Sequence, residues 1–344
     1  MDFSSEPGPK MAACIRGSAP AASSSSLSYH ESGSHLYVAS EGDSVLRIFD
    51  CVKGGTSQMI KLQRVGIKTV KATHHKRCVL FSPGQKNGPK KNNVYYLSVH
   101  ENKILREFEG HQSVVSSISM SPVDDSFLSS SADGTVRLWD LGKSGNCVCE
   151  LKLPQNVQGP SLAAYDSTGL VFSVTAKMAG DEGNHINLFD ARNYSAGPFS
   201  EMEVKRQDIE AKLRSSGSTP EHAYALSRSE WTSIDFNKSG KQILIGTNGG
   251  VALTIDGYEG SVLHSFQMEG GADSSPLPMA ACFTSDDKSV LCGNHDGTVS
   301  CYQADTGLLA RKLRGHVDRV NCLASNPKYA QIASSCTNTA VWVW

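Results

Sequence analysis

One short pattern recurs along the chain: an apolar run that ends in an aromatic or aliphatic residue, often followed by aspartate. It occurs seven times, at Arg47–Asp50, Tyr95–Ser98, Arg137–Asp140, Asn187–Asp190, Leu253–Asp256, Ser300–Gln303 and Val341–Trp344. The third residues of these segments are separated by 48, 42, 50, 66, 47 and 41 residues. A period of about 40 to 45 residues, lengthened by loop insertions, is typical of stacked or radial repeat units. The repeat therefore predicts one array of about seven similar units.

Each repeat contains further short apolar runs, separated by turn-forming residues. Ser113–Met120 is followed by a turn at Pro122–Asp125 and then by a second run that starts at Ser126. Aspartate stands six residues before the strand end in three repeats (Asp43, Asp133 and Asp296), and a small residue follows it. A tight turn between antiparallel strands requires this arrangement. Four short strands per repeat, with little helical periodicity, predict an all-β, seven-bladed WD-repeat β-propeller rather than a β-sandwich.

The third repeat has the residues of a structural hydrogen-bond network. His111 follows glycine and precedes Trp139 by 28 residues, and Asp133 lies in the turn between them. The order predicts a network of His111, Asp133, Trp139 and a serine of the second strand, either Ser129 or Ser131. We select Ser131. Because an orphaned buried partner costs about 1 to 3 kcal/mol, these side chains are assigned a structural role and not a catalytic one.

Two other repeats depart from this pattern. Thr337 occupies the aspartate position of the last repeat, counted from its strand end, and Tyr302 occupies the tryptophan position of the sixth. We expect both blades to depend on packing alone.

The propeller is expected to span residues 27–344. Residues 1–26 are predicted to be a disordered or weakly ordered tail, and the polar segment 205–228 an exposed insertion between blades four and five. The chain stops at the third strand of the last blade, so that blade is expected to lack an outer strand. The one candidate, Met11–Arg16, is short and only weakly β-favouring.

Composition excludes several classes of function. The net charge of −1 provides no general field for nucleic acid or an anionic membrane, and no apolar run is long enough to span a bilayer. The sequence has no nucleophile elbow, phosphate-binding glycine loop, dinucleotide fingerprint or Cys-x-x-Cys pair. The sequence therefore predicts a protein that is not an enzyme and has no cofactor and no metal. His74, His75 and Cys78 form the nearest approach to a zinc site, but no second group of Cys or His residues accompanies them to complete the ligand set.

A local basic patch is the one charged feature that stands out. Lys86, Lys90 and Lys91 lie in a Gly/Asn/Pro-rich loop, and Lys68 lies nearby in the sequence. These four lysines predict a surface for an acidic or phosphorylated peptide. A simple solvated loop is the alternative.

Several segments resemble one particular family of propellers. They are Ser119–Phe127 and Ala132–Leu141, together with Tyr96–Ser98, Gly169–Phe172, Gly197–Phe199, Thr247–Gly249 and the last blade from Asn326 to Trp342. Over these residues, and from about Leu27 to the end of the chain, the sequence is similar to the Swd2-like WD-repeat subunit of COMPASS histone methyltransferases. The Ser-Pro-Val-Asp-Asp segment is more specific than any Trp-Asp pair.

The resemblance implies a nuclear scaffold that joins a SET-domain methyltransferase and other COMPASS subunits and supports histone H3 lysine methylation at transcribed genes. It also implies membership of protein phosphatase and transcript 3′-end processing complexes. Neither direct sequence-specific nucleic-acid binding nor membrane binding is implied. Two features differ from the family: residues 1–26 lack a convincing β run, and the 205–228 insertion is long.

Two other functions are consistent with a propeller. A substrate receptor of a cullin-type ubiquitin ligase tends to have Trp-Asp-x-Arg, which only Phe189-Asp190-Ala191-Arg192 approximates here. A propeller hydrolase would need acids or metal ligands that converge at the channel, and the sequence shows none.

Overall fold

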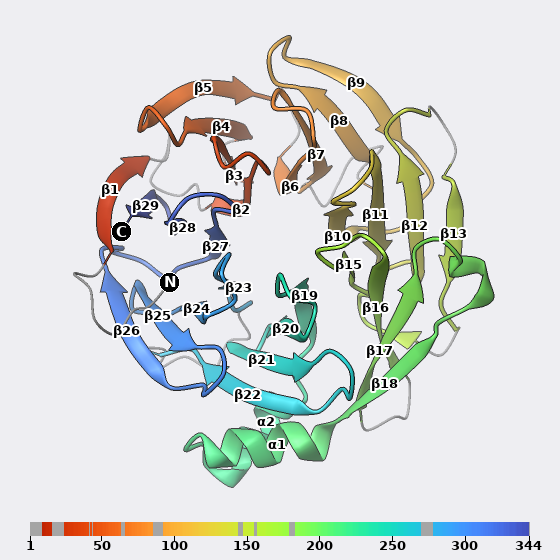
Figure 1. Ribbon diagram of the computed structural model, residues 1–344, viewed down its shortest axis with the longest axis vertical. Helices are drawn as coiled ribbons and strands as arrows, with labels where there is room; N and C mark the ends of the chain where they lie inside the picture. Colours follow the sequence, from red (N-terminus) through yellow and green to blue (C-terminus); the bar gives the residue numbers. More distant parts are fainter. Residues whose placement is uncertain are drawn as a thin grey trace.

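Seven antiparallel sheets form a closed ring in the computed structural model (Figure 1). The structure describes residues 9–15, 24–40, 42, 44–62, 66–84, 92–143, 147–154, 157–178, 183–269 and 278–343. The family model and the sheet topology confirm the seven-bladed WD-repeat propeller expected from the sequence.

Each blade runs from an inner strand beside the central channel to an outer strand at the rim (Figure 1). Blades one to three are β2 (Ser24–Tyr29), β3 (His35–Ser40), β4 (Val45–Asp50), β5 (Gly55–Lys61); β6 (Ile67–Ala72), β7 (Cys78–Pro83), β8 (Val94–Ser98), β9 (Lys103–Phe108); and β10 (Val115–Met120), β11 (Ser126–Ser131), β12 (Thr135–Asp140), β13 (Cys149–Lys152). Adjacent strands pair antiparallel because each follows the last through a short turn.

Blade four has one extra short strand, and blades five and six are regular. They comprise β14 (Val157–Gln158), β15 (Ala163–Tyr165), β16 (Val171–Met178), β17 (Gly183–Asp190), η1 (Tyr194–Ala196), β18 (Ser200–Lys205); β19 (Trp231–Phe236), β20 (Gln242–Thr247), β21 (Val251–Asp256), β22 (Val262–Gln267); and β23 (Ala281–Phe283), β24 (Ser289–Gly293), β25 (Thr298–Gln303), β26 (Leu309–Arg314). Both β14 and β15 pair with β16.

The last blade is closed by the N-terminal segment. It contains β27 (Cys322–Ser325), β28 (Gln331–Ser335), β29 (Thr339–Val343) and, as its fourth strand, β1 (Lys10–Ile15). The expectations of an unclosed blade and a disordered tail are therefore wrong for residues 10–15, and Ser24–Ser26 belong to β2. Residues 1–8 and 16–23 lie outside the described residues. The free edge of β29 supplies the hydrogen-bonding partners that the weak local propensity of this segment lacks.

The hydrophobic core is divided among the blades. The described residues form seven buried clusters, and each cluster lies between two neighbouring blades, for example Ile15 and Leu36 with Val341 between blades one and seven. Ring closure therefore buries apolar surface at every blade interface.

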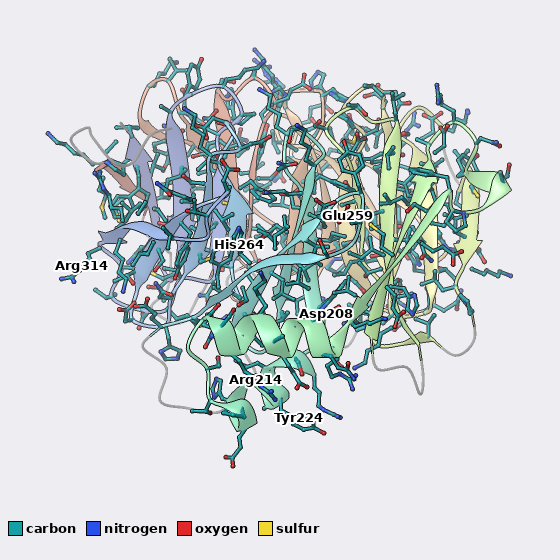
Figure 2. The ribbon with its side chains drawn as sticks, turned by 60° about the horizontal axis from the view of Figure 1, so that its bottom comes forward. Asp208, Arg214, Tyr224, Glu259, His264 and Arg314 are labelled. Carbon is teal, nitrogen blue, oxygen red and sulfur yellow. The ribbon has the colours of Figure 1, made fainter. Side chains whose placement is uncertain are left out.

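The segment after blade four forms two helices, α1 (Arg206–Ser215) and α2 (Pro220–Ser227), which lie against the rim of blade five (Figure 1). Ile209, Leu213 and Ala223 are buried in the cluster between blades four and five. The opposite face carries exposed residues such as Arg214 and Tyr224 (Figure 2). The insertion thus has a polar outer face, as expected, but also a buried apolar one. No helix among the described residues is long and apolar enough to cross a membrane.

Candidate functional site

Four side chains of blade three form a series of hydrogen bonds. Trp139 Nε1 donates to Ser129 Oγ at 2.8 Å, and Ser129 Oγ lies 2.7 Å from His111 Nε2. His111 Nδ1 lies 3.0 Å from Asp133 Oδ2. The network joins the segment before β10 to β11, the β11–β12 turn and β12, so it connects two strands of the blade with the segment that leads into a third.

The serine of this network is Ser129, so our choice of Ser131 was wrong. Ser131 donates to the backbone carbonyl of Ser113 at 3.0 Å instead. The two serines share a face of β11, but Ser131 lies two residues, about 7 Å, closer to the turn. At this position along β11 the Ser131 hydroxyl reaches the Ser113 carbonyl and not the side chains of His111 and Trp139.

The protonation states match a structural role. Burial lowers the pKa of His111, although hydrogen bonding to Asp133 opposes this effect. Burial disfavours the charge of Asp133, but hydrogen bonds from Thr135, Gln112 and His111 hold its pKa below the usual value. An ionised Asp133 therefore accepts from a neutral His111. Both ring nitrogens are occupied within the protein, which leaves neither for a substrate.

A second network lies in blade seven, where packing alone was expected. Trp342 Nε1 donates to Ser334 Oγ at 2.7 Å, Ser334 Oγ lies 2.6 Å from His316 Nε2, and His316 Nδ1 lies 3.1 Å from Cys336 Sγ. The aspartate position is thus held by Cys336 and not by Thr337. The sequence count failed because it started from Val343, whereas the ring in the network belongs to Trp342; Cys336 precedes Trp342 by six residues, as Asp133 precedes Trp139.

Blade six also contains a buried polar network. The amide of Asn294 is fully buried and donates to Thr298 Oγ1 at 2.9 Å and Ser300 Oγ at 2.7 Å. Tyr302 packs against Phe266 with ring centroids 4.6 Å apart. The expectation that this blade depends on packing alone was therefore wrong as well.

The central channel contains a cavity of about 510 Å³ at one end. Ser25, Ser116 and Thr232 are among its lining residues, and Lys68 is the one charged residue among the described residues that line it. A cavity of this size admits a short partner segment. We call this end of the channel the Lys68 funnel.

The other end of the channel has a cavity of about 540 Å³ with a mixed charge. Lys71 and Asp235 both line it. Burial within the ring raises the pKa of Asp235, and the positive charge of Lys71 opposes this effect. Among the described residues that line the Lys68 funnel there is no carboxylate to offset its positive charge.

Of the four lysines predicted to form a basic patch, one lies among the described residues. Lys68 is half-buried in β6, whereas Lys86, Lys90 and Lys91 lie outside the described residues. The proximity of Lys68 to the channel was not visible in the sequence, because it depends on how the inner strands surround the axis.

The histidine and cysteine group of blade two makes structural contacts. His74 Nδ1 lies 2.7 Å from Glu31 Oε2, and its Nε2 lies 3.0 Å from the carbonyl oxygens of Ser121 and Asp124. Cys78 is buried in β7. Among the described residues, no three His, Cys, Asp or Glu side chains are placed to hold a metal ion.

Comparison with known proteins gives the family. The model "WD domain, G-beta repeat" matches residues 102–140 and 307–344. WD repeat-containing protein 82 of Drosophila melanogaster is 35% identical over 92% of this chain and 89% of its own length. COMPASS component SWD2 of Saccharomyces cerevisiae is 27% identical over 93% of this chain and 90% of its own length.

A third relative matches over a shorter region. Set1 complex component swd2 of Schizosaccharomyces pombe is 33% identical over 69% of this chain and 58% of its own length. The similarity to the Drosophila protein covers all seven blades, not only the repeat motif, and it confirms the family expected from the sequence. The chain therefore belongs to the Swd2-like family of WD-repeat proteins.

Proposed function

We propose that this protein is a non-catalytic scaffold subunit of a nuclear COMPASS-type histone H3 lysine methyltransferase complex. The observation that carries the proposal is similarity over more than nine-tenths of the chain to a protein named as a COMPASS component. The hydrogen-bonding histidines of blades three and seven support it, because their ring nitrogens are used within the fold. On this proposal the propeller positions partner segments, and the partner supplies the chemistry.

Affinity purification of the tagged full-length chain, followed by mass spectrometry, tests the assignment. Recovery of a SET-domain methyltransferase with other COMPASS subunits is the expected result. Recovery of cullin adaptors without them would favour the ubiquitin-ligase alternative. Phosphatase or 3′-end processing subunits alone would place the protein in those complexes instead.

Depletion of the protein tests whether the methyltransferase complex needs it for assembly. We expect loss of the protein to lower histone H3 lysine methylation or the level of the methyltransferase, because assembly fails. The purified chain should transfer no methyl group to histone H3. Unchanged methylation and enzyme levels after depletion would contradict the proposal.

We also propose the Lys68 funnel as a partner-binding surface for a segment with an acidic or phosphorylated side chain. No carboxylate is among its described lining residues, so the ammonium group has no counter-charge there. A partner's negative charge would therefore gain a salt bridge in a partly desolvated site, where such pairs are stronger than on an open surface.

The Lys68→Met variant tests this surface, since methionine keeps the unbranched stem and removes the charge. We expect recovery of COMPASS subunits to fall about tenfold, the equivalent of roughly 1.4 kcal/mol. Lys103→Met, in the exposed outer strand β9 of the same blade, is the matched control. Equal recovery with both variants would show that the funnel is not the binding surface.

A further inference from the structure

A hydroxyl residue precedes a proline at four places in the chain: Ser82-Pro83, Ser121-Pro122, Thr219-Pro220 and Ser275-Pro276. Proline has a fixed φ angle and no backbone N–H, so each pair places a hydroxyl group beside a rigid apolar ring that has no hydrogen-bond donor. A kinase active site can select this combination without contacts to any other side chain. Such pairs are therefore acceptors for proline-directed kinases wherever the hydroxyl group is accessible.

Accessibility separates the three pairs that the structure describes. Ser82 lies in β7 and Ser121 directly follows β10, and each is only 1% exposed. Thr219, in contrast, is exposed, and so are Pro220 and the two residues after it. Ser275 lies outside the described residues. Of the three described pairs, the fold thus leaves one hydroxyl group open to a kinase.

The backbone at Thr219 has the shape that an acceptor residue needs. It lies in the loop between α1 and α2, which are outside the ring of blades (Figure 1). Its φ of −64° and ψ of 154° are extended, as is usual for a residue before proline. Helix α2 has only eight residues, so its first turn can open locally while the blades stay folded. Thr219 can therefore enter a kinase active site without unfolding of the propeller.

Hydrogen bonds also distinguish Thr219 from the serines before it. Ser215 and Ser216 each donate to the carbonyl of Lys212, and Ser218 accepts from the Gln267 amide at 2.7 Å. Thr219 Oγ1 accepts from the backbone N–H of the third residue of α2, at 3.3 Å. Its own hydrogen is not donated to any group among the described residues. The oxygen of Thr219 is thus the one in this loop whose proton is free to leave.

We propose that Thr219 is a phosphorylation site for a proline-directed protein kinase, and that the phosphate strengthens the start of α2. In this step Thr219 Oγ1 attacks the γ-phosphorus of ATP, a new P–O bond forms and the bond to ADP breaks. The hydroxyl proton passes to the catalytic base of the kinase, and ADP leaves. The product has about −1.5 to −2 charges at this position at pH 7. The proposal does not depend on membership of a methyltransferase complex.

The effect on α2 follows from the place of Thr219 at the start of the helix. Its side chain already accepts from the backbone N–H of His222, and a phosphate provides three stronger acceptor oxygens there. Negative charge at the start of a helix is favoured by the helix dipole. Glu221, in the first turn of α2, opposes the new charge, whereas Lys212 and Arg214, in the last turn of α1, favour it. We therefore expect a more stable first turn and not an unfolded one.

Treatment of the folded, full-length protein with a proline-directed kinase and ATP tests the site. The protein has the Ser275→Ala substitution, so that only the pairs of the described residues are measured. We expect phosphate at Thr219, mapped by mass spectrometry, and about tenfold less or lower still at Ser82 and Ser121, which are exposed only when a blade opens. No phosphate at Thr219, or equal amounts at all three residues, would overturn the proposal.

Four variants show whether the Thr-Pro pair is what the kinase recognises. Thr219→Val should accept no phosphate at this position, and Thr219→Ser should restore it. Pro220→Ala keeps the hydroxyl group but should react about tenfold more slowly, because the rigid ring is lost. Ser218→Ala, one residue earlier, is the matched control and should react as the parent protein does. A Pro220→Ala variant that reacted at the parent rate would contradict a proline-directed site.

Hydrogen exchange of the phosphorylated protein tests the effect on α2. We expect about fivefold slower exchange in the amides of α2 and no change in β10 to β12. Removal of the phosphate with a phosphatase should restore the original rate. Unchanged or faster exchange in α2 would overturn the proposed effect of the phosphate on the helix.

Discussion

The hydroxyl group of Ser129 contacts the side chains of both Trp139 and His111, and the serine is fully buried. Ser131, two residues away on the same strand and equally buried, contacts neither ring. At the scale of one residue, the position of a side chain relative to its partners decides its role. Residue type and burial are the same for both serines.

The tryptophan and histidine of this network should be important for stability. We expect Trp139→Ala and His111→Ala each to lower the free energy of unfolding by about 2 to 4 kcal/mol, because they remove a buried ring or leave its partners without hydrogen bonds. Urea unfolding of the purified variants measures this.

Val148→Ala, at an exposed position in the same blade, is the control and should change stability by less than about 0.5 kcal/mol. If either network variant unfolded at the same urea concentration as wild type, the structural role of the network would be refuted.

At the scale of elements, turns of neighbouring blades are connected across one face of the ring. His74 connects the first turns of blades one, two and three through Glu31, Ser121 and Asp124. All its partners are acceptors, so both ring nitrogens donate. Burial opposes the charge, but hydrogen bonds to Glu31, Asp124 and Ser121 outweigh it and raise the pKa of His74.

This raised pKa predicts a defined pH dependence. A histidine whose pKa is higher in the folded state stabilises the fold fully below the unfolded pKa, about 6.5. Its contribution disappears as the pH rises through the folded pKa. We therefore expect wild type to lose somewhat less than about 1 kcal/mol of stability from this contact as the pH rises from about 6 to 8, given the partial exposure of both side chains.

Urea unfolding across this pH range, compared with Glu31→Gln, measures the effect. The variant should show a weaker pH dependence, because its side chain is neutral. His75→Gln, at the adjacent histidine, is the control and should behave as wild type. Identical pH profiles for wild type and Glu31→Gln would refute the role of the ion pair.

The helical insertion is a second element whose role depends on packing. Leu213 of α1 is fully buried between blades four and five, whereas the adjacent Arg214 is exposed. We expect Leu213→Ala to lower the free energy of unfolding by about 2 to 5 kcal/mol and Arg214→Ala by less than about 0.5 kcal/mol. Chemical denaturation of both variants measures the difference. Equal stabilities would mean that the helices are an independent appendage.

At the scale of the whole molecule, a strand from one end of the chain completes the sheet formed by the other. Each of the seven blade interfaces has its own apolar cluster, and the one between blades seven and one includes Ile15 of β1. The ring has no unpaired β29 edge because β1 covers it. Opening this one junction would expose both an apolar cluster and a strand edge.

Deletion of residues 1–15 tests this closure. We expect the shortened protein to melt at a lower temperature and to self-associate as its concentration rises, since the β29 edge becomes free. Thermal denaturation and analytical ultracentrifugation measure these effects. Deletion of residues 1–8, which leaves β1 intact, is the control. If both deletions behaved as wild type, β1 would not be needed for closure.

Features that depend on local patterns could be predicted before the fold was known. The period of the strand ends predicted the number of blades, the spacing from His111 to Trp139 predicted a network in blade three, and the long interval at 205–228 predicted an insertion. Each of these signals lies within one repeat or in the distance between two repeats, so no knowledge of long-range contacts is needed to read it.

Three other features follow from the assembled ring: the closing strand, the contact of Cys336 with His316 and the surroundings of Lys68. Lys10–Ile15 has little strand propensity of its own and becomes a strand because β29, more than 300 residues away, offers an unpaired edge. Cys336 is identified as the counterpart of Asp133 because the fold places its sulfur 3.1 Å from His316 Nδ1. Lys68 faces the channel only because seven inner strands surround one axis. These features depend on contacts between residues far apart in the chain, which a local pattern does not encode.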